Sequence, residues 1–372
     1  MTIAAHISVN GAEKDHGSLF IETCLTMLAN RHPNHHFIFI FDKPFDAASI
    51  IPKNIKVVQL GPSIRNRLLL HYWYQFKLPR LLEKNKVDVY LNADLLCSLR
   101  TDVSQCMIIP DLGFLQKKIP LAASENRYRK KYIGRSLQKA SMVAVMNESL
   151  RDQLQVKYKV SADKITCIPI GIDIPESPVQ ENEKNYIKNT HAQGHEYFLY
   201  FATASSKENI IPLLKAFSIF KKWQKSGMQL VILFDAPLSG TEIAGFSNYK
   251  YREEVKPLYL ENISERQSLI AAAYAAICMP TIEIMETGGM ESFGHGIPLI
   301  SIDLPFYKAQ YANGALFTDT LEKNISEQMM RLYKDEHLRN NLVAGCKAIA
   351  EKNSWEQAML SLEETLQLSP LV

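Results

Sequence analysis

The residues best suited to chemistry lie near the C-terminal end of the chain, in the stretch Glu283-Ile-Met-Glu-Thr-Gly-Gly-Met-Glu291. A carboxylate can accept hydrogen bonds from two neighbouring hydroxyls, which is what sugar and ribose rings present. If a helix begins near residue 289, Thr287, Gly288 and Gly289 place free main-chain N–H groups at its N-terminus, where phosphate binds. This combination predicts a nucleotide-sugar pocket. The spacing alone is equally typical of a capped surface helix followed by an ordinary turn at Gly296-Ile-Pro298.

The bulk properties fit an enzyme of two domains. With 372 residues the chain is long enough for two domains of ordinary size. Its hydrophobic fraction of 47% and charged fraction of 22% are those of a soluble globular protein. The net charge of +3 permits attraction to anionic ligands or a membrane surface, but it is too small for a nucleic-acid-binding footprint.

Three features favour a cytoplasmic protein. The cysteines are scattered and form no CxxC pair, a pattern typical of reduced thiols and of neither a disulfide framework nor a zinc site: Cys24, Cys97, Cys106, Cys167, Cys278 and Cys346. The N-terminus, Met1-Thr-Ile-Ala-Ala-His, lacks the basic start and apolar core of a secretory signal. The most apolar stretch, Ser268–Ile282, stops at Pro280 and is too short to span a bilayer.

Strand-like and helical segments alternate along the whole chain. Strands are expected at residues 37–41, 55–60, 87–91, 107–109, 142–145 and 165–168, and then at 197–201, 229–234, 276–278 and 299–302. Helical patterns separate them at 19–30, 72–84, 128–139, 211–225 and 265–275. This alternation predicts an α/β fold with parallel sheets covered by helices on both faces.

The segments form two series, which predicts two domains. Pro169–Pro175 ends the first series, and the polar stretch Glu176–His195 precedes the second. We therefore expect an N-terminal domain over 1–175, a linker over 176–195, a C-terminal domain over 196–352 and a final helix over 353–372 that returns toward the N-terminal domain. Two doubly wound domains facing across a cleft would bind ligand at the carboxyl ends of their strands.

A series of motifs follows in a consistent order along the chain: Asp163–Asp173, Tyr197–Phe217, the pair Glu283 and Glu291, Gly296–Pro298 and Asn353–Ala358. Together they resemble the interdomain signature, donor-domain opening, E-x7-E pair, GxP and late fsWexxA motif of family-4-type retaining glycosyltransferases (glycosyl transferases group 1). The resemblance covers nearly the whole chain. It implies the GT-B fold, with two Rossmann-like doubly wound domains whose parallel sheets face across a cleft, the first binding the acceptor and the second the nucleotide-sugar donor.

The resemblance also implies roles for the C-terminal residues. Glu291 would accept both ribose hydroxyls of the nucleotide, and Glu283 would contact the transferring sugar near the reaction centre. Thr287, Gly288 and Gly289 would contact sugar and diphosphate through main-chain N–H groups. Transfer in this family retains the anomeric configuration through an oxocarbenium-like, front-face displacement. The protein and a helix dipole neutralise the leaving group, so neither a cofactor nor an obligatory metal is expected.

The chain departs from the family where the diphosphate is usually held. Thr203 and Glu208 stand in place of an Arg and a Lys, and Glu286 adds a carboxylate close to the expected diphosphate. Two lost charge-assisted contacts would remove roughly 3–6 kcal/mol of binding free energy, at ~1.5–3 kcal/mol each. Lys207 is the nearest cation, so we expect it to contact the diphosphate. The alternative for Lys207 is a solvated lysine at a helix start.

The N-terminal domain retains less of the family pattern. Pro110-Asp111 replaces its His-Asp pair, so the histidine near the acceptor is missing, and Asp111 is the remaining catalytic candidate. A helix N-cap or a turn residue is the alternative for Asp111. The glycine-rich loop survives around Asp15-His16-Gly17 or Asn10-Gly11, which makes Gly17 a candidate for binding the nucleotide sugar.

Three further segments have two interpretations each. Arg65–Lys86 and Arg127–Arg135 would suit an anionic membrane surface or a phosphorylated acceptor, but solvated helix faces have the same composition. Peripheral contact with the inner face of the membrane is therefore a further option. His32-Pro-Asn-His-His36 could suggest a metal cluster, and its turn chemistry favours a helix-to-strand loop.

The leading interpretation is an enzyme of polysaccharide biosynthesis that moves a hexose from a nucleotide-diphosphate sugar to a saccharide or lipid-linked acceptor. An alternative from another class is a catalytically silent GT-B protein that binds a nucleotide or glycan, or scaffolds a glycan-assembly complex. The substitutions at Pro110, Thr203 and Glu208 favour that alternative. A hydrolase or epimerase on the same fold is a third interpretation.

Overall fold

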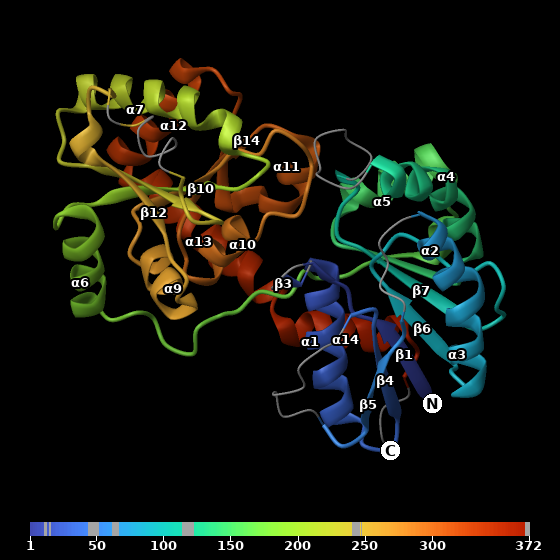
Figure 1. The fold of residues 1–372 in the computed structure, drawn as a ribbon. Helices are drawn as coiled ribbons and strands as arrows, with labels where there is room; N and C mark the ends of the chain where they lie inside the picture. The colour runs from blue at the N-terminus through green and yellow to red at the C-terminus, as the bar shows by residue number, and fades with distance from the viewer. Residues whose placement is uncertain are drawn as a thin grey trace. The chain divides into compact units, whose positions relative to one another are not determined.

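A computed structural model describes the chain at residues 1–10, 13–14, 16–43, 52–61, 67–113, 123–239, 246 and 248–368 (Figure 1). The chain divides into two compact units. Unit 1 contains Met1–Gly171 and Asn353–Val372, and unit 2 contains Ile172–Lys352. Each unit is built on its own parallel sheet, as the alternation of strands and helices predicted.

The sheet of unit 1 has seven parallel strands in the order β5-β4-β1-β6-β7-β8-β9. Their bounds are β1 Thr2–His6, β4 His36–Phe41, β5 Ile55–Gln59, β6 Val89–Asn92, β7 Ser104–Ile109, β8 Met142–Val145 and β9 Ile165–Cys167. A short antiparallel hairpin of β2 (Val9–Asn10) and β3 (Glu13–Lys14) follows β1. Strands are added first on one side of β1 and then on the other, so the topology is doubly wound with its switch point between β1 and β6.

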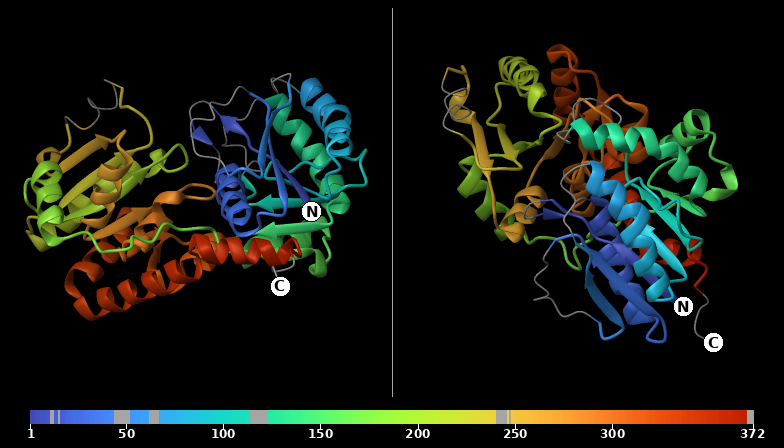
Figure 2. Two further views of the ribbon diagram at one scale, coloured as in Figure 1. Left: turned by 90° about the horizontal axis from the view of Figure 1, so that it is seen from below. Right: turned by 45° about the vertical axis from the view of Figure 1, so that its right-hand side comes forward.

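Helices cover both faces of this sheet, because parallel strands carry apolar side chains on each side. One face carries α1 (His16–Arg31) and α14 (Trp355–Thr365), which pack against each other (Figures 1 and 2). The opposite face carries three helices, α2 (Arg67–Tyr72), α3 (Leu78–Lys84) and α4 (Ala123–Lys139). A further helix, α5 (Glu148–Tyr158), packs beside β8 and β9. The final helix of the chain therefore belongs to unit 1.

The aromatic segment between α2 and α3 is part of the core of unit 1. A π-helical turn, Trp73–Lys77, joins the two helices, so the single helix expected over 72–84 is three segments. Trp73 and Tyr74 are fully buried. The Arg100 guanidinium lies over the ring of Phe76, 4.3 Å from its centroid. The two buried rings are therefore not exposed to a membrane surface.

The sheet of unit 2 has six parallel strands in the order β12-β11-β10-β13-β14-β15. Their bounds are β10 Tyr197–Ala202, β11 Gln229–Phe234, β12 Val255–Tyr259, β13 Ala275–Cys278, β14 Leu299–Ile302 and β15 Ala315–Thr318. The order corresponds to 3-2-1-4-5-6 in chain numbering, the order of dinucleotide-binding doubly wound sheets. The switch point of unit 2 lies between β10 and β13.

Helices again cover both faces. On one face lie α7 (Ile210–Gln224) and α12 (Glu322–Lys334), which pack together (Figure 1). On the other face lie α6 (Glu181–Ala192), α9 (Ile263–Ala271), α10 (Thr287–Gly294) and α13 (Glu336–Lys352). The short helix α11 (Pro305–Tyr311) follows β14. The helices on both faces of this sheet therefore all belong to unit 2.

Residues 176–195, expected as a linker between the domains, contain helix α6 of unit 2. Glu183 accepts a hydrogen bond from the hydroxyl of Ser268 in α9 at 2.6 Å. His191 lies 3.1 Å from Glu265, at the start of the same helix. The polar composition of this stretch therefore reflects the exposed face of a docked helix.

Three strands of the two parallel sheets were not predicted from the sequence: β1, β12 and β15. The strand β12 contains Pro257, which has no N–H to donate. It is tolerated because β12 is at the edge of the sheet and pairs only with β11. The central strand β1, Thr-Ile-Ala-Ala-His, is rich in alanine, which is depleted in strands.

Two motifs that are far apart in the sequence meet inside unit 1. Gly171 has a φ of +82°, and a Cβ atom at this position would overlap the ring of Trp355. The side-chain oxygen of Asn353 accepts a hydrogen bond from the main-chain N–H of Ile170 at 3.3 Å. The ring of Trp355 also lies 6.1 Å from that of Phe20 in α1. A contact that only glycine permits therefore fixes α14 to the end of the first strand series.

The thiols act as packing groups. All six cysteines lie in the described part of the chain, and none is bonded to another. Burial raises the pKa of Cys97 and of Cys106 to about 12, which keeps both thiols protonated near neutral pH. Among the described residues, no helix has the length and apolarity needed to cross a bilayer.

Replacing Gly171 with alanine should destabilise the protein by about 2–5 kcal/mol, because the new methyl group meets both an unfavourable φ and the Trp355 ring. Urea unfolding followed by circular dichroism measures this change. Gly134→Ala is the matched control, since Gly134 lies within α4 and has open space at its Cβ position. It should stabilise the protein by ~0.5–1 kcal/mol. Equal effects at the two positions would contradict the proposed contact.

Candidate functional site

Two loops leave the sheet of unit 2 at its switch point. Strands β10 and β13 are neighbours and end at Ala202 and Cys278, so the loops that follow them start at the same edge of the sheet. Thr281 joins the loops, since its N–H and its hydroxyl donate to the main-chain oxygen of Ser205 at 2.8 and 2.9 Å. Ligands of doubly wound sheets bind at this edge. The geometry makes these loops the candidate binding site of unit 2.

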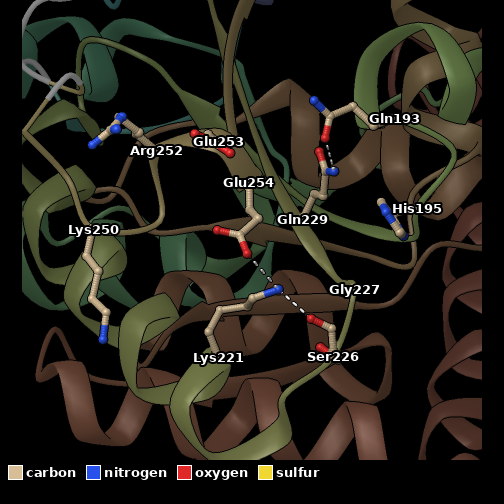
Figure 3. Close-up of a pocket in the computed structure, with 10 residues that line it drawn as sticks. All are labelled: Gln193, His195, Lys221, Ser226, Gly227, Gln229, Lys250, Arg252, Glu253 and Glu254. Atoms are coloured by element: carbon tan, nitrogen blue, oxygen red, sulfur yellow. Dashed lines mark hydrogen bonds and ion pairs between the residues drawn. The ribbon is translucent and has the colours of Figure 1, made fainter.

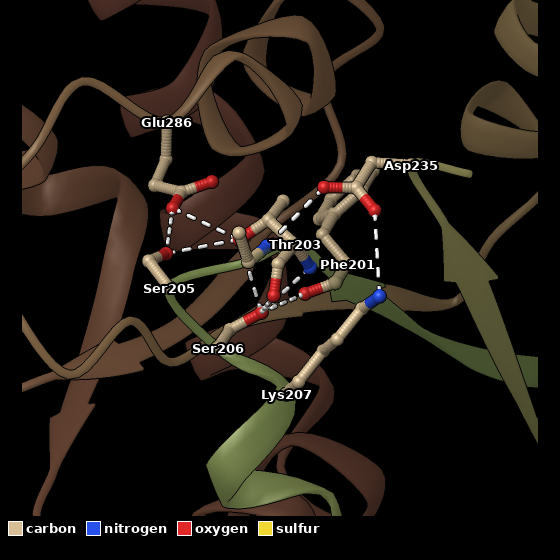
Figure 4. A network of polar contacts seen from close by, with 8 residues as sticks. Phe201, Thr203, Ser205, Ser206, Lys207, Asp235 and Glu286 are labelled. Atoms are coloured by element: carbon tan, nitrogen blue, oxygen red, sulfur yellow. Dashed lines mark hydrogen bonds and ion pairs between the residues drawn. The ribbon is translucent and has the colours of Figure 1, made fainter. Parts of the chain in front are cut away.

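A buried carboxylate lies between the two loops. Glu286 is 4% exposed, and its Oε1 accepts hydrogen bonds from the hydroxyls of Ser205 and Thr203, the latter at 3.1 Å (Figure 4). The Thr203 hydroxyl also contacts that of Ser206 at 3.2 Å. Ser206 in turn donates to the main-chain oxygen of Phe201 at 2.7 Å. A hydroxyl cluster bonded to a carboxylate therefore stands where the sequence resemblance placed a phosphate-binding arginine.

Helix α10 begins at Thr287, directly after this carboxylate, where the sequence predicted a helix from about residue 289. A Cβ atom on Gly288 would lie 2.5 Å from the ring of Phe201, and one on Gly289 would lie 2.6 Å from the Tyr311 hydroxyl. The two glycines therefore allow the helix to pack closely on β10 and α11. The main-chain N–H groups of the first three residues of α10 make no hydrogen bond to any described residue.

The two glutamates predicted to bind the donor are held by different helices. Glu283 accepts a hydrogen bond from the main-chain N–H of Phe306, in the first turn of α11, at 3.2 Å. Glu291 lies on α10 and forms an ion pair with Arg266 of α9 at 3.1 Å. Burial raises the pKa of Glu291, and the Arg266 guanidinium acts in the opposite direction. Glu283, Glu286 and Glu291 are thus oriented by three separate elements, namely α11, the loop after β10 and α9.

Lys207 follows the hydroxyl cluster and is already paired. Its ammonium lies 4.0 Å from Oδ1 of Asp235, the residue after β11 (Figure 4). Oδ2 of Asp235 accepts a hydrogen bond from the N–H of Ala204 at 3.2 Å. Glu208 is exposed. To reach the expected diphosphate, the Lys207 ammonium would have to move away from the carboxylate of Asp235.

The predicted residues of unit 1 lie in a turn and in a helix start. Oδ1 of Asp111 accepts a hydrogen bond from the main-chain N–H of Gly113 at 2.8 Å, the geometry of a turn residue. Gly17 is buried in the first turn of α1. Of the two candidate glycine-rich loops, Asp15 and Gly11 fall outside the described residues.

A charged cluster that was not predicted from the sequence lies at the switch point of unit 1. His6 ends β1 and is bonded through Nδ1 to Asp94, which lies two residues after β6. The Tyr74 hydroxyl donates to the same carboxylate at 2.5 Å, and Arg129 lies 3.8 Å from its other oxygen. Burial alone would raise the pKa of Asp94, but His6 and Arg129 hold it below its ordinary value. The cluster lies at the carboxyl end of β1, beside the switch point of unit 1, and the hydroxyl cluster lies at the corresponding end of β10 in unit 2.

Asn92 adds a second unusual group to this edge. It closes β6 and is fully buried, and neither polar atom of its side chain has a hydrogen-bond partner among the described residues. Buried amides are almost always satisfied, so this exception is unusual. The sequence carried one available signal, the polar pair Asn92 and Asp94 directly after a buried strand. His6 had no such signal because β1 was not predicted.

Residues 32–35 of the histidine-rich segment form the loop between α1 and β4, as its turn chemistry favoured, and His36 begins β4. His32 is bonded through Nε2 to Glu363 of α14, and its ring lies 5.3 Å from that of His35. Within the described ranges, no group of three or more His, Cys, Asp or Glu side chains is arranged to hold a metal ion. The segment therefore connects α1 to β4 and contacts α14.

The chain is similar to known proteins in its N-terminal sequence and in its fold. The family model described as Glycosyltransferase Family 4 matches residues 21–176. No curated protein matches the chain at a significant level.

Solved glycosyltransferases share the fold over almost the whole chain. A glycosyltransferase from Rickettsia africae ESF-5 is 12% identical, with 99% of each chain covered and a TM-score of 0.72. WaaG, a glycosyltransferase involved in lipopolysaccharide biosynthesis, is 12% identical, with 98% of this chain and 99% of that chain covered and a TM-score of 0.71. Anabaena Alr3699/HepE, solved in complex with UDP-glucose, is 13% identical, with 99% of each chain covered and a TM-score of 0.70.

The shared fold is GT-B, with two doubly wound parallel sheets. The Glycosyltransferase Family 4 model thus matches the N-terminal part of the chain, and the whole chain has the fold of solved glycosyltransferases.

The exchange Glu286→Gln should tighten the binding of UDP by about tenfold while leaving uridine affinity nearly unchanged. The amide still accepts the hydroxyl hydrogen bonds, but it no longer repels the diphosphate. Isothermal titration calorimetry with both ligands measures the difference. Glu327→Gln, at an exposed position of α12, is the matched control. An equal gain for uridine, or no gain for UDP, would show that Glu286 does not lie beside the diphosphate.

Proposed function

We propose that this enzyme transfers a hexose, with retention of anomeric configuration, from a nucleotide-diphosphate sugar to a saccharide or lipid-linked acceptor in cytoplasmic polysaccharide biosynthesis. UDP-glucose is the first donor to test, because structures of the similar HepE contain UDP and UDP-glucose. One observation carries the proposal. The open N-terminus of α10 lies at the switch point of unit 2 in one segment with Glu283 and Glu291.

The donor would be bound by groups of different chemistry on this one segment. The free N–H groups at the start of α10 suit the diphosphate, because they donate hydrogen bonds and the helix dipole favours negative charge. Glu291 would accept the two ribose hydroxyls, with Arg266 favouring its ionised form. Glu283 would contact the sugar and stabilise the positive charge that develops on it during transfer. In this proposal the leaving diphosphate is stabilised without an obligatory metal.

The charge balance of this site constrains the donor pose. Glu286 and Asp235 oppose a diphosphate, and Lys207 is paired with Asp235. Donor binding would therefore turn the Lys207 ammonium from Asp235 toward the phosphates. The hydroxyls of Thr203 and Ser205 would exchange part of their bonding with Glu286 for phosphate oxygens, which removes little hydrogen-bond energy because one acceptor replaces another.

The acceptor would bind unit 1, at the edge where Pro110 replaces the histidine of the family. His6 and Asp94 form an orienting pair there, since the carboxylate fixes which ring nitrogen carries the proton. Asp111 follows the neighbouring strand β7 and is the second candidate for contact with the acceptor. Basic residues of α4 would favour an anionic or membrane-bound acceptor.

Incubation with UDP-, GDP- and ADP-sugars tests the proposal as a whole. One class of sugar nucleotide should raise the thermal midpoint and be hydrolysed slowly in the absence of acceptor. Proton NMR of the first released sugar should show the anomeric configuration of the donor. An inverted anomer would contradict retention, and the absence of both stabilisation and hydrolysis with every donor would favour the catalytically silent GT-B protein.

The two glutamates should separate binding from chemistry. Glu291→Gln should weaken UDP binding by ~1–3 kcal/mol through the loss of a charge-assisted hydrogen bond to the ribose. Glu283→Gln should leave UDP affinity nearly intact and lower the rate of donor hydrolysis at least ~10-fold, because its interaction strengthens as positive charge develops. Calorimetry and initial rates on both variants measure this. If Glu283→Gln weakened UDP binding without lowering the rate of donor hydrolysis, the role assigned to Glu283 at the sugar would be wrong.

A further inference from the structure

The Glu291 carboxylate is accessible although one of its oxygens is already bonded. Its side chain is 27% exposed, so a ligand in the candidate donor site can reach it. Oε2 accepts a hydrogen bond from Nη2 of Arg266, in α9, at 3.1 Å. Oε1 makes no hydrogen bond to any described residue. A cation of a neighbouring helix therefore holds one oxygen and leaves the other for a hydroxyl of a donor.

The segment that begins unit 2 lies against the same side of α10. Gly294 is three positions after Glu291, so the two residues share one face of the helix. A Cβ atom on Gly294 would overlap the main-chain oxygen of Asp173. Asp173 is exposed, and it forms no ion pair with a described residue. A glycine contact therefore fixes a residue with an unneutralised carboxylate close to Glu291.

Charges of both signs act on Glu291 as a result. Burial raises the pKa of this carboxyl group, the Arg266 guanidinium lowers it, and the Asp173 carboxylate raises it. The cation comes from α9 and the anion from the segment before α6. The protonation of Glu291 therefore depends on two side chains from separate elements, with opposite effects.

The other charged groups around α10 are placed elsewhere. Glu286 precedes the helix and is bonded to hydroxyls of the loop after β10. His295 follows the helix, and burial and the nearby Lys184 lower its pKa, which keeps the ring neutral near neutral pH. Lys347 of α13 lies beside Gly296, beyond the end of α10, and β13 carries no charged residue. The cation of α9 and the carboxylate of the first segment are thus the charges that act on the ribose-binding position.

A second charged pair of unit 2 has a different arrangement. The ammonium of Lys221, in α7, lies 3.4 Å from Oε1 of Glu254 (Figure 3). It also donates to the main-chain oxygens of Ser226 and Met228. These three acceptors match the three N–H bonds of the ammonium, and the lysine side chain is only 6% exposed. That pair is closed and holds the turn after α7, whereas the pair between α9 and α10 is open to a ligand.

We propose that Arg266 and Asp173 are positioning residues that set the charge of the ribose-binding carboxylate in opposite directions. The inference rests on the function proposed above, because it concerns how Glu291 accepts the ribose. Arg266 holds Oε2 and favours the ionised form. Asp173 acts against it, because a like charge favours the protonated form. A protonated Glu291 is a weaker acceptor, so donor affinity falls as the pH falls through the pKa of this residue.

Calorimetric titration of the full chain with uridine and with UDP, at a series of pH values below neutrality, tests the proposal. Uridine is the main probe because it carries the ribose without the phosphates, which titrate in the same range. The uridine affinity of the unaltered protein should fall toward acid pH. Glu291→Gln should weaken binding and remove this pH dependence, because the amide does not titrate.

The two positioning residues should move the midpoint of this fall in opposite directions. Arg266→Gln should raise it by ~1 pH unit, and Asp173→Asn should lower it by ~0.2–0.7 pH units, as expected for a more exposed charge. Arg266→Lys keeps the positive charge and should stay close to the unaltered protein. Arg331→Gln, at an exposed position of α12, is the matched control and should have no effect. Thermal midpoints at each pH report whether the variants fold.

Opposite shifts would support the proposal, since a loss of packing alone does not move the midpoint in two directions. Unchanged midpoints, or shifts of the same sign, would overturn it. An effect of Arg266→Gln on UDP but not on uridine would also overturn it, because Arg266 would then act on the diphosphate. If the unaltered protein bound neither ligand, or Glu291→Gln bound both as tightly, the proposed donor site itself would be wrong, and the inference with it.

Discussion

The candidate donor site depends on how closely helix α10 approaches strand β10. Side-chain carbons at Gly288 and Gly289 would meet the Phe201 ring and the Tyr311 hydroxyl, so any larger residue would push the helix away from the sheet. Close packing brings the first N–H groups of α10 to the carboxyl edge of the sheet. It also brings Glu286 within hydrogen-bond distance of the hydroxyls that follow β10. One contact therefore places both the helix end proposed to bind the diphosphate and the Glu286 carboxylate that would oppose it.

The charged side chains of the candidate donor site are already paired or hydrogen-bonded before any ligand binds. Glu286 is bonded to hydroxyls, Glu291 to Arg266, and Lys207 lies beside Asp235. A bound donor would therefore exchange hydrogen-bond partners in this site, and its affinity would depend on small differences between hydrogen bonds. Family relatives use a guanidinium and an ammonium at the phosphate position according to the sequence resemblance. In the proposed donor pose, the main-chain dipole of α10 would have a correspondingly larger share of that role.

Much of the fold was predictable because buried parallel strands are short, apolar and separated by amphipathic helices. The prediction missed β1, whose alanines have low strand propensity, and β12, whose Pro257 is tolerated only at an edge. The helix at the Gly-Gly turn was predicted from local chemistry. The bonds of Glu286 to residues about eighty positions earlier were not, because no local pattern encodes a contact between loops of two neighbouring strands. The pair of His6 and Asp94 was missed for the same reason.

A crystal structure of the protein with UDP tests the central claim most directly. The account predicts the diphosphate within hydrogen-bond distance of the main-chain N–H groups of Gly288 and Gly289, and the ribose hydroxyls on the carboxylate of Glu291. It also predicts that the Lys207 ammonium has turned from Asp235 toward the phosphates. UDP bound elsewhere in unit 2, or a diphosphate that leaves the N-terminus of α10 uncontacted, would contradict it.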